Sequence, residues 1–254
     1  MQTEETDGAD GTAEFKSRLF ENYSSEHLQI SAESVKVNVA QSRPYLRRMI
    51  AECMPANQSA AILDLGCGFG GLLSALRSGG YTNLHGVDIS AEQVALARHL
   101  GFEQVRCEGA QEFLGGTADG TYDVVIAFDV LEHLSRAELF AIGKEIRRVL
   151  KPGGRLVVHV PNGEGLFFGS ILFGDLTHEL AFTRRSLNQL AGACGMRLAR
   201  TLEDTPSVHG LFSLIRRIIW SIGILPLRVL STAETGEGLL APLSRNMLAI
   251  LERP

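Results

Sequence analysis

The chain has 254 residues, 45% of them hydrophobic, so it can bury the core of one α/β domain with an added lobe. Its formal net charge of −5 argues against a general nucleic-acid-binding protein, which would present a basic surface. The four cysteines are scattered without a CxxC pair, which is typical of free thiols in a reducing cytosol. We therefore expect a cytoplasmic protein built around one main domain.

The N-terminal region divides into two predicted parts. Residues 1–14 are polar and acidic, which predicts a disordered tail and no signal peptide. Residues 15–56 are expected to form a helical cap, with one or two helices over 31–52 and a break at Pro44. The main domain then follows as residues 57–254.

From residue 60 onward, the pattern alternates between strands and helices, which predicts a doubly wound, parallel α/β sheet. Strands are expected near residues 61–65, 84–88, 104–107, 122–128 and 155–160. Helices are expected near residues 70–78, 90–99, 109–114 and 136–150. Two further strands near 197–202 and 246–251 complete a seven-stranded sheet.

A helical insertion at about 204–243 is expected before the last strand. Its apolar residues follow helical spacing at Leu211, Leu214, Ile215, Ile218, Ile219 and Ile222. Arg216 and Arg217 fall on the other side, and together with Pro226 they argue against a membrane-spanning helix. The stripe can serve as a lid on the core, as a dimer interface, or as an interfacial helix at a membrane that carries a lipid-linked substrate.

The most informative motif is the glycine-rich turn after the first strand, Asp64-Leu65-Gly66-Cys67-Gly68-Phe69-Gly70-Gly71. Its glycines let the backbone approach a ligand, and the next helix offers unpaired N–H groups there. A second acid, Asp88, ends the next strand, where a carboxylate can accept both hydroxyls of a ribose. Asp64 would repel the pyrophosphate of a nicotinamide cofactor but suits the cationic ammonium group of S-adenosylmethionine. The turn therefore disfavours a nicotinamide-dependent oxidoreductase.

At this turn the sequence resembles the class I S-adenosylmethionine-dependent methyltransferases. Later blocks at residues 86–90, 122–134 and 148–158 continue the resemblance in order, and it covers roughly residues 15–253. It implies a Rossmann-like methyltransferase fold in which the last strand inserts antiparallel beside the fifth. It also implies that the N-terminal helices lie over the cofactor. Tyr23 and Tyr45 are then candidate lid contacts, and the alternative, favoured by their residue type, is that they are core or surface aromatics.

The resemblance also implies which residues bind the cofactor. They are Asp64, Gly66, Cys67, Gly68, Asp88, Ile89, Ala110, Gln111 and Phe128. The residues of the turn would bracket the amino-acid end, Asp88 would hold the ribose, and Ile89 would lie against adenine. Phe128 would place a backbone carbonyl near the methionine moiety. Glu108-Gly109-Ala110 departs from the family's usual Gly-Asp-Ala, so Gln111 would replace the contact to the adenine edge.

A second group of polar residues begins at the end of the fourth strand, where open parallel sheets bind ligands. Asp129-x-x-Glu132-His133 resembles the Glu-x-x-Glu-His segment with which ubiquinone and small-RNA 2′-O-methyltransferases bind a divalent metal, with Asp in the first position. His178 resembles the later histidine of the RNA enzymes. The implied metal ligands are Asp129, Glu132, His133 and His178, with His178 and His133 as catalytic residues.

A metal-free interpretation of the same residues stays open. Glu-His-Leu after the fourth strand also occurs in methyltransferases without metal, where it serves helix capping and packing. In that case His178 is the best general base, because the ordinary pKa of histidine lies near 6.5. His159, inside the fifth strand, is expected to be a packed core histidine.

We interpret the chain as an S-adenosylmethionine-dependent methyltransferase that acts on a hydroxyl of a sugar, a glycan or a related small molecule. Residues 161–183 resemble bacterial methyltransferases associated with polysaccharide assembly. A lipid-linked acceptor, peripheral contact with the inner membrane face and a homodimer stay open. The alternatives are an RNA 2′-O-methyltransferase, which the acidic net charge disfavours, and a non-catalytic cofactor-binding interaction protein, which the intact motifs disfavour.

Overall fold

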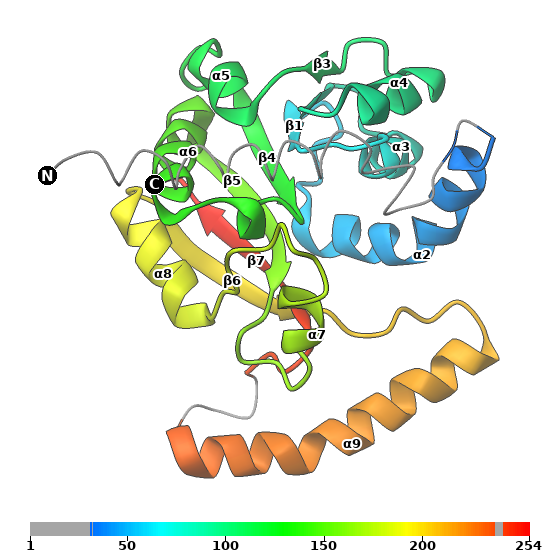
Figure 1. Ribbon diagram of the computed structural model, residues 1–254, viewed down its shortest axis with the longest axis vertical. Helices are drawn as coiled ribbons and strands as arrows, with labels where there is room; N and C mark the ends of the chain where they lie inside the picture. Colours follow the sequence, from blue (N-terminus) through cyan, green and yellow to red (C-terminus); the bar gives the residue numbers. More distant parts are fainter. Residues whose placement is uncertain (1–30, 32, 237–240) are drawn as a thin grey trace, which may run out of the picture.

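The computed structural model of the chain describes residues 31, 33–236 and 241–254 (Figure 1). The predicted tail at 1–14, the start of the predicted cap and Tyr23 lie outside these residues.

A seven-stranded sheet forms the centre of the molecule, in the order β3-β2-β1-β4-β5-β7-β6. Its strands are β1 (Ile62–Leu65), β2 (Leu84–Asp88), β3 (Arg106–Cys107), β4 (Tyr122–Phe128), β5 (Leu150–Pro161), β6 (Arg197–Glu203) and β7 (Asn246–Glu252). The first five strands pair in parallel, and β7 pairs antiparallel with both β5 and β6. The predicted α/β sheet and its antiparallel last strand are confirmed.

The central strands read as continuous apolar runs because both of their faces are buried. Val125 and Ala127 of β4 pack into the core on one face, whereas Val124 and Ile126 pack into the core on the other. Helices α6 and α8 supply residues to the first core, and α2 and α3 supply residues to the second. The helices around the sheet are α2 (Val35–Cys53), α3 (Gly71–Ser78), α4 (Ala91–His99), α5 (Ala110–Gly115), α6 (Arg136–Val149) and α8 (Arg184–Ala193).

Helix α2 runs without interruption through Pro44, which the sequence analysis had placed at a break. A proline inside a helix removes one backbone hydrogen bond and crowds the preceding turn. Here Leu46, Met49 and Cys53 on the following turns are buried against the sheet. Their packing outweighs the local preference for a break.

The chain order reverses direction between β1 and β4, and the carboxyl ends of these strands form a topological switch point. The 3₁₀ turn η2 (Leu131–His133) lies directly beyond β4, and the short helix α7 (Gly169–Leu172) follows β5. After α7 the chain returns to the sheet edge, where Phe182 donates its N–H to the carbonyl of Pro161 at 2.8 Å. This edge therefore gathers the turn after β1, the end of β2 and both segments that carry the acid-histidine residues.

The predicted insertion contains one long helix, α9 (Leu211–Thr235), which continues through Pro226 well beyond the predicted apolar stripe. Figure 1 shows it at the lower end of the molecule, apart from the sheet and its covering helices. No helix in the described part of the chain has both the length and the hydropathy needed to cross a membrane.

Candidate functional site

The turn between β1 and α3 is shaped by its glycines. Gly66, Gly68 and Gly70 have φ values of 75°, 51° and 81°, a region that favours glycine. A Cβ on Gly66 would also lie 2.5 Å from Cγ2 of Val130, which precedes η2. The N–H groups of Gly66 and Cys67 donate to the carbonyl of Val87 at 2.8 and 3.0 Å. The turn is thus fixed against β2 on one side and against η2 on the other.

Asp88 links the end of β2 to this turn. Its Oδ2 accepts a hydrogen bond from the N–H of Gly68 at 2.8 Å, and its Oδ1 accepts one from Ser90 at 2.9 Å. Burial raises the pKa of Asp88, and these two N–H groups act in the opposite direction by stabilising the carboxylate. The side chain is held in place, and its remaining lone pairs can still accept hydrogen bonds from hydroxyl groups.

Asp64 is a buried acid with one carboxyl oxygen that no described residue hydrogen-bonds. Its side chain is 1% exposed, and Oδ2 has no hydrogen-bond partner in that part of the chain. Burial, followed by the nearby charge of Asp88, raises the pKa of Asp64 to about 8. Such a carboxyl group favours a ligand that brings a cation or hydrogen-bond donors to it.

The other residues predicted to bind the cofactor lie around the same edge. Cys67 is buried, and burial raises the pKa of its thiol far above the ordinary value, so it is a packing residue of the turn. Ile89 is 66% exposed beyond β2, and Ala110 and Gln111 begin α5. Phe128 ends β4, where its ring stacks on His159 at a centroid distance of 4.3 Å. Their cofactor contacts stay predictions.

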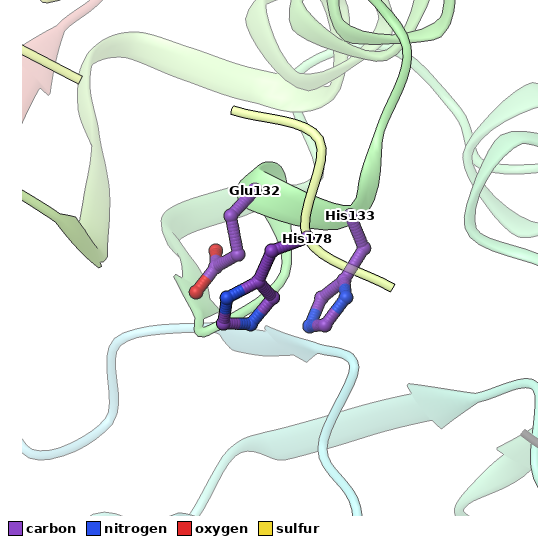
Figure 2. A group of neighbouring side chains, drawn as sticks. All are labelled: Glu132, His133 and His178. Carbon is purple, nitrogen blue, oxygen red and sulfur yellow. The ribbon is translucent and has the colours of Figure 1, made fainter. Parts of the chain in front are cut away.

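Glu132, His133 and His178 come together beside the switch point. One ligand atom from each side chain lies within 4.8 Å of the other two, and Figure 2 shows the side chains extending next to one another. Glu132 and His133 belong to η2, whereas His178 arrives on the segment between α7 and α8. The carbonyl of Glu132 accepts hydrogen bonds from Glu179 at 2.7 Å and Leu180 at 3.1 Å, which attach that segment to η2.

Hydrogen bonds at Nδ1 orient both imidazole rings. Nδ1 of His178 lies 2.9 Å from the carbonyl of Ile171, so it carries the proton and leaves the lone pair at Nε2. Nδ1 of His133 lies 2.8 Å from the hydroxyl of Thr177, which itself donates to Asp175 at 2.6 Å and therefore accepts from the ring. Such bonds to a second partner are what metal-binding and basic histidines use to fix their tautomer.

Burial shifts the pKa values of Glu132 and His133 toward their uncharged forms. Glu132 is 1% exposed, and its Oε2 has no hydrogen-bond partner among the described residues. Burial, and next the charge of Asp129, raises the pKa of Glu132 to about 8. Burial and then His178 lower the pKa of His133, which keeps its ring neutral. A carboxylate with an unused buried oxygen beside two imidazoles is a donor set that fits a divalent cation of the zinc or transition-metal type.

Asp129, the fourth predicted ligand, lies outside this group. Its backbone is left-handed, with φ of 54°, and its Oδ1 lies 2.5 Å from Nδ1 of His159. His159 is buried as expected, but it is held between Asp129 and Asp204, whose Oδ2 lies 3.5 Å from Nε2. Burial lowers the pKa of His159, but the two carboxylates outweigh it and raise the pKa to about 10. Oδ1 of Asp129 thus pairs with His159, and Asp129 is not among the described residues whose ligand atoms lie within 4.8 Å of one another.

The pairing of His159 with Asp129 and Asp204 was not predicted from the sequence. Phe128 and His159 are direct neighbours in the β4–β5 register, so an acid at position 129 next to that histidine was available as a signal. The contact with Asp204 could not be predicted in this way, because Asp204 follows β6 and reaches the site only through the tertiary fold.

The sheet order, the antiparallel last strand and the glycine-rich turn define the class I S-adenosylmethionine-dependent methyltransferase fold, and S-adenosylmethionine is the cofactor of this class. Residues 63–158, which run from β1 into β5, match the family described as "Methyltransferase domain". A solved S-adenosylmethionine-dependent methyltransferase from Archaeoglobus fulgidus has the same fold, with a TM-score of 0.57 and 21% identity, covering 90% of this chain and 97% of that one. The predicted resemblance is confirmed.

Two curated relatives extend the comparison. An uncharacterized 37.1 kDa protein in transposon Tn4556 of Streptomyces fradiae is 29% identical over 221 residues, covering 82% of this chain and 61% of that protein. A ubiquinone biosynthesis O-methyltransferase of Paraburkholderia xenovorans is 35% identical over 97 residues, covering 37% of this chain and 40% of the enzyme. The chain therefore spans less than two thirds of the length of each. Other relatives are N- and C-methyltransferases, so relatives of this chain methylate different kinds of atom.

Proposed function

We propose that the protein transfers the methyl group of S-adenosylmethionine to a hydroxyl oxygen of a sugar, a glycan or a related small molecule. The observation that carries the proposal is the cluster of Glu132, His133 and His178 beside the cofactor turn. The contact between the Gly66 position and Val130 puts η2 directly against that turn. A base at this place is close to where the methyl group would be presented.

In this proposal the cofactor lies along the carboxyl edge of the sheet. Asp64 and the turn residues face the amino-acid end, and the buried carboxyl group of Asp64 meets the ammonium group. Asp88, already held by two backbone N–H groups, accepts the ribose hydroxyls. Ile89 covers adenine, Gln111 contacts its edge, and Phe128 offers its carbonyl near the methionine moiety.

The chemistry of the acceptor follows from the cluster. In methyl transfer the bond from sulfur to the methyl carbon breaks as the bond from oxygen to that carbon forms, so the protein must mainly align the acceptor and take its proton. An alcohol is a weak nucleophile until it loses that proton, whereas an amine needs only to be neutral. Nε2 of His178 carries a lone pair and can accept the proton, which favours a hydroxyl acceptor.

Glu132, His133 and His178 are also the residues that would hold a divalent metal. A bound cation would lower the pKa of the acceptor hydroxyl, which is the usual contribution of a metal to such a site. Oε2 of Glu132, which is buried and has no hydrogen-bond partner among the described residues, supports this arrangement. Without metal, the same lone pair of His178 serves as a plain general base.

The test is methylation of a panel of sugar nucleotides, lipid-linked glycans and short RNAs with labelled S-adenosylmethionine. His178→Ala should reduce turnover of the accepted substrate by roughly 10²-fold while cofactor affinity stays unchanged. His99→Ala, at the exposed end of α4, is the matched control and should keep full activity. Turnover of His178→Ala at the wild-type rate would refute the role of the cluster.

Chelation separates the two mechanisms. Activity that is lost with a chelator and restored by a divalent ion shows that a metal is used. Activity that is indifferent to the chelator but lost in His178→Ala assigns His178 as the base. Methylation of RNA in preference to the sugars would replace the proposed acceptor class.

A further inference from the structure

Helix α9 has its apolar face turned away from the rest of the protein. The large apolar side chains exposed along it are Leu211, Phe212, Leu214, Ile215, Ile218, Ile219, Ile222, Leu225, Val229 and Leu230. The fully buried positions of the helix are Ser213 and Ile224. An amphipathic helix of a globular protein normally buries its apolar stripe against the core. An exposed apolar surface of this kind marks a binding surface.

Polar and charged bonds hold α9 in this orientation. Arg217 donates a hydrogen bond to the hydroxyl of Thr205, and Arg228 forms an ion pair with Glu203 at 2.5 Å. Arg48 of α2 binds the same corner from the other side, at 2.9 Å from the carbonyl of Glu203 and 2.7 Å from that of Thr205. Since these bonds use the polar side of α9, the apolar side must face outward.

The charge of this region is opposite to that of the whole chain. Helix α9 contains Arg216, Arg217 and Arg228 and one acid, Glu234, whereas the chain has a net charge of −5. Arg216 is exposed, while Arg217 and Arg228 are bonded to Thr205 and Glu203. A helix with a broad apolar face and arginines on its polar side is typical of segments that lie in the interface of a membrane with anionic lipids. The arginines and Pro226 oppose a crossing of the hydrocarbon layer.

We propose that α9 docks on an anionic lipid surface, with its axis along the interface and its apolar face in the boundary between headgroups and acyl chains. The residues beside the apolar stripe favour a lipid surface over pairing of α9 with a second copy of the chain. Coiled-coil helices carry complementary charges at those positions. Here they are Phe212, Leu214, Ile219, Ser221, Pro226 and Arg228. Arg228, the one charged residue among them, already pairs with Glu203, so these positions add apolar breadth and no charge pair between two copies.

A second set of exposed apolar residues lies near the candidate site. Phe167, Phe173 and Leu176 are exposed on the segment around α7, and Figure 1 shows α7 on the side of the sheet that faces α9. This segment leads into His178. A lipid surface at α9 would therefore lie toward the acceptor side of the protein, which suits an acceptor attached to a lipid. That consequence rests on the proposed function, whereas docking itself does not.

The experiment measures binding of the full-length protein to vesicles. One set contains phosphatidylglycerol in phosphatidylcholine, and the other contains phosphatidylcholine alone. We expect co-sedimentation with the anionic vesicles at low salt and a marked loss of binding at high salt. Trp220, the single tryptophan, has a buried Nε1, so Ile222→Trp in a Trp220→Phe background places the fluorophore on the exposed apolar face. Bromine-labelled acyl chains should quench its fluorescence if α9 is the docking segment.

Variants test the face of the helix. Ile215→Ser with Ile219→Ser should lower binding to anionic vesicles by about 10-fold or more, because two apolar side chains no longer enter the interface. Val37→Ser with Phe140→Ser removes two exposed apolar side chains from α2 and α6 and should bind as the unmodified protein does. Calorimetry with S-adenosylmethionine should give unchanged affinity for both, which shows that they fold.

Three outcomes overturn the proposal. The first is no sedimentation with anionic vesicles at any salt concentration. The second is equal binding by the Ile215→Ser, Ile219→Ser protein. The third is a concentration-dependent dimer that the same variant abolishes, without vesicle binding, which would assign the apolar face to a second copy.

Discussion

Asp64 offers a sharp test of the cofactor site, because its buried carboxyl group should oppose folding once it ionises. Its pKa rises from an ordinary value of 3.8 to about 8 in the folded protein. Between these values the folded state binds more protons than the unfolded state, so stability falls as pH rises from about 4 to 8. Asp64→Asn removes this titration while keeping the shape of the side chain.

The size of the effect follows from about 1.36 kcal/mol for each pKa unit. At pH 5 the ionisation of unfolded Asp64 favours unfolding by roughly 1.6 kcal/mol, and at pH 8 by roughly 5 kcal/mol. The stability of Asp64→Asn relative to the unmodified protein should therefore rise by roughly 3–4 kcal/mol from pH 5 to pH 8. Urea denaturation of the cofactor-free protein at several pH values measures it.

Two further measurements make the test specific. Asp123→Asn is the control, because burial raises the pKa of Asp123 but its bonds to Lys151 and to the N–H of Ala61 outweigh this and lower it. The stability of that variant relative to the unmodified protein should stay level between pH 5 and pH 8. Asp64→Asn should also weaken S-adenosylmethionine binding by about 10-fold or more, since a charged acceptor for the ammonium group is lost. A difference that stays flat with pH in Asp64→Asn would refute the reasoning.

Two other substitutions test the turn and the buried ion pair. Gly66→Ala should destabilise the protein by about 2 kcal/mol or more and weaken cofactor binding, because φ is positive there and the new Cβ meets Val130. Gly192→Ala, inside α8 and with no atom of the described residues within 4 Å of the new Cβ, is the control and should have little effect in the same denaturation and calorimetry assays. His159→Gln should cost about 3 kcal/mol at pH 6 and progressively less toward pH 10, since the stability from the charged ring is complete below pH 6.5 and disappears as pH passes about 10. A cost for His159→Gln that does not change with pH would show that the ring is not charged in the folded protein.

The parts of the fold that could be predicted are those set by local pattern. The buried run of β4 and the glycines of the turn at Gly66 and Gly68 carry their own conformational signal, and the structure places them as expected. The continuity of α2 through Pro44 could not be predicted, because it depends on packing against the sheet. The outward face of α9 depends on Glu203 and Thr205, which only the tertiary fold brings near its arginines.

The candidate site shows the same division. Glu132 and His133 lie next to each other in one turn, so their proximity was readable, and the motif around His178 suggested the third member. Asp129 instead pairs with His159, which comes from another strand and also contacts a second acid, Asp204. Sequence spacing alone cannot rank two partners for one carboxylate when one of them reaches it across the sheet.

The attachment of the His178 segment at both of its ends has a consequence for how this protein can diversify. The carbonyl of Glu132 holds residues 179 and 180, and Phe182 is bonded to Pro161 at the end of β5. Residues 163–174, which include α7, lie between these fixed points and carry exposed phenylalanines. Side-chain substitutions there can reshape what approaches the cluster, as long as the backbone carbonyl of Ile171 continues to hold Nδ1 of His178. Acceptor preference can therefore evolve separately from the reactive groups.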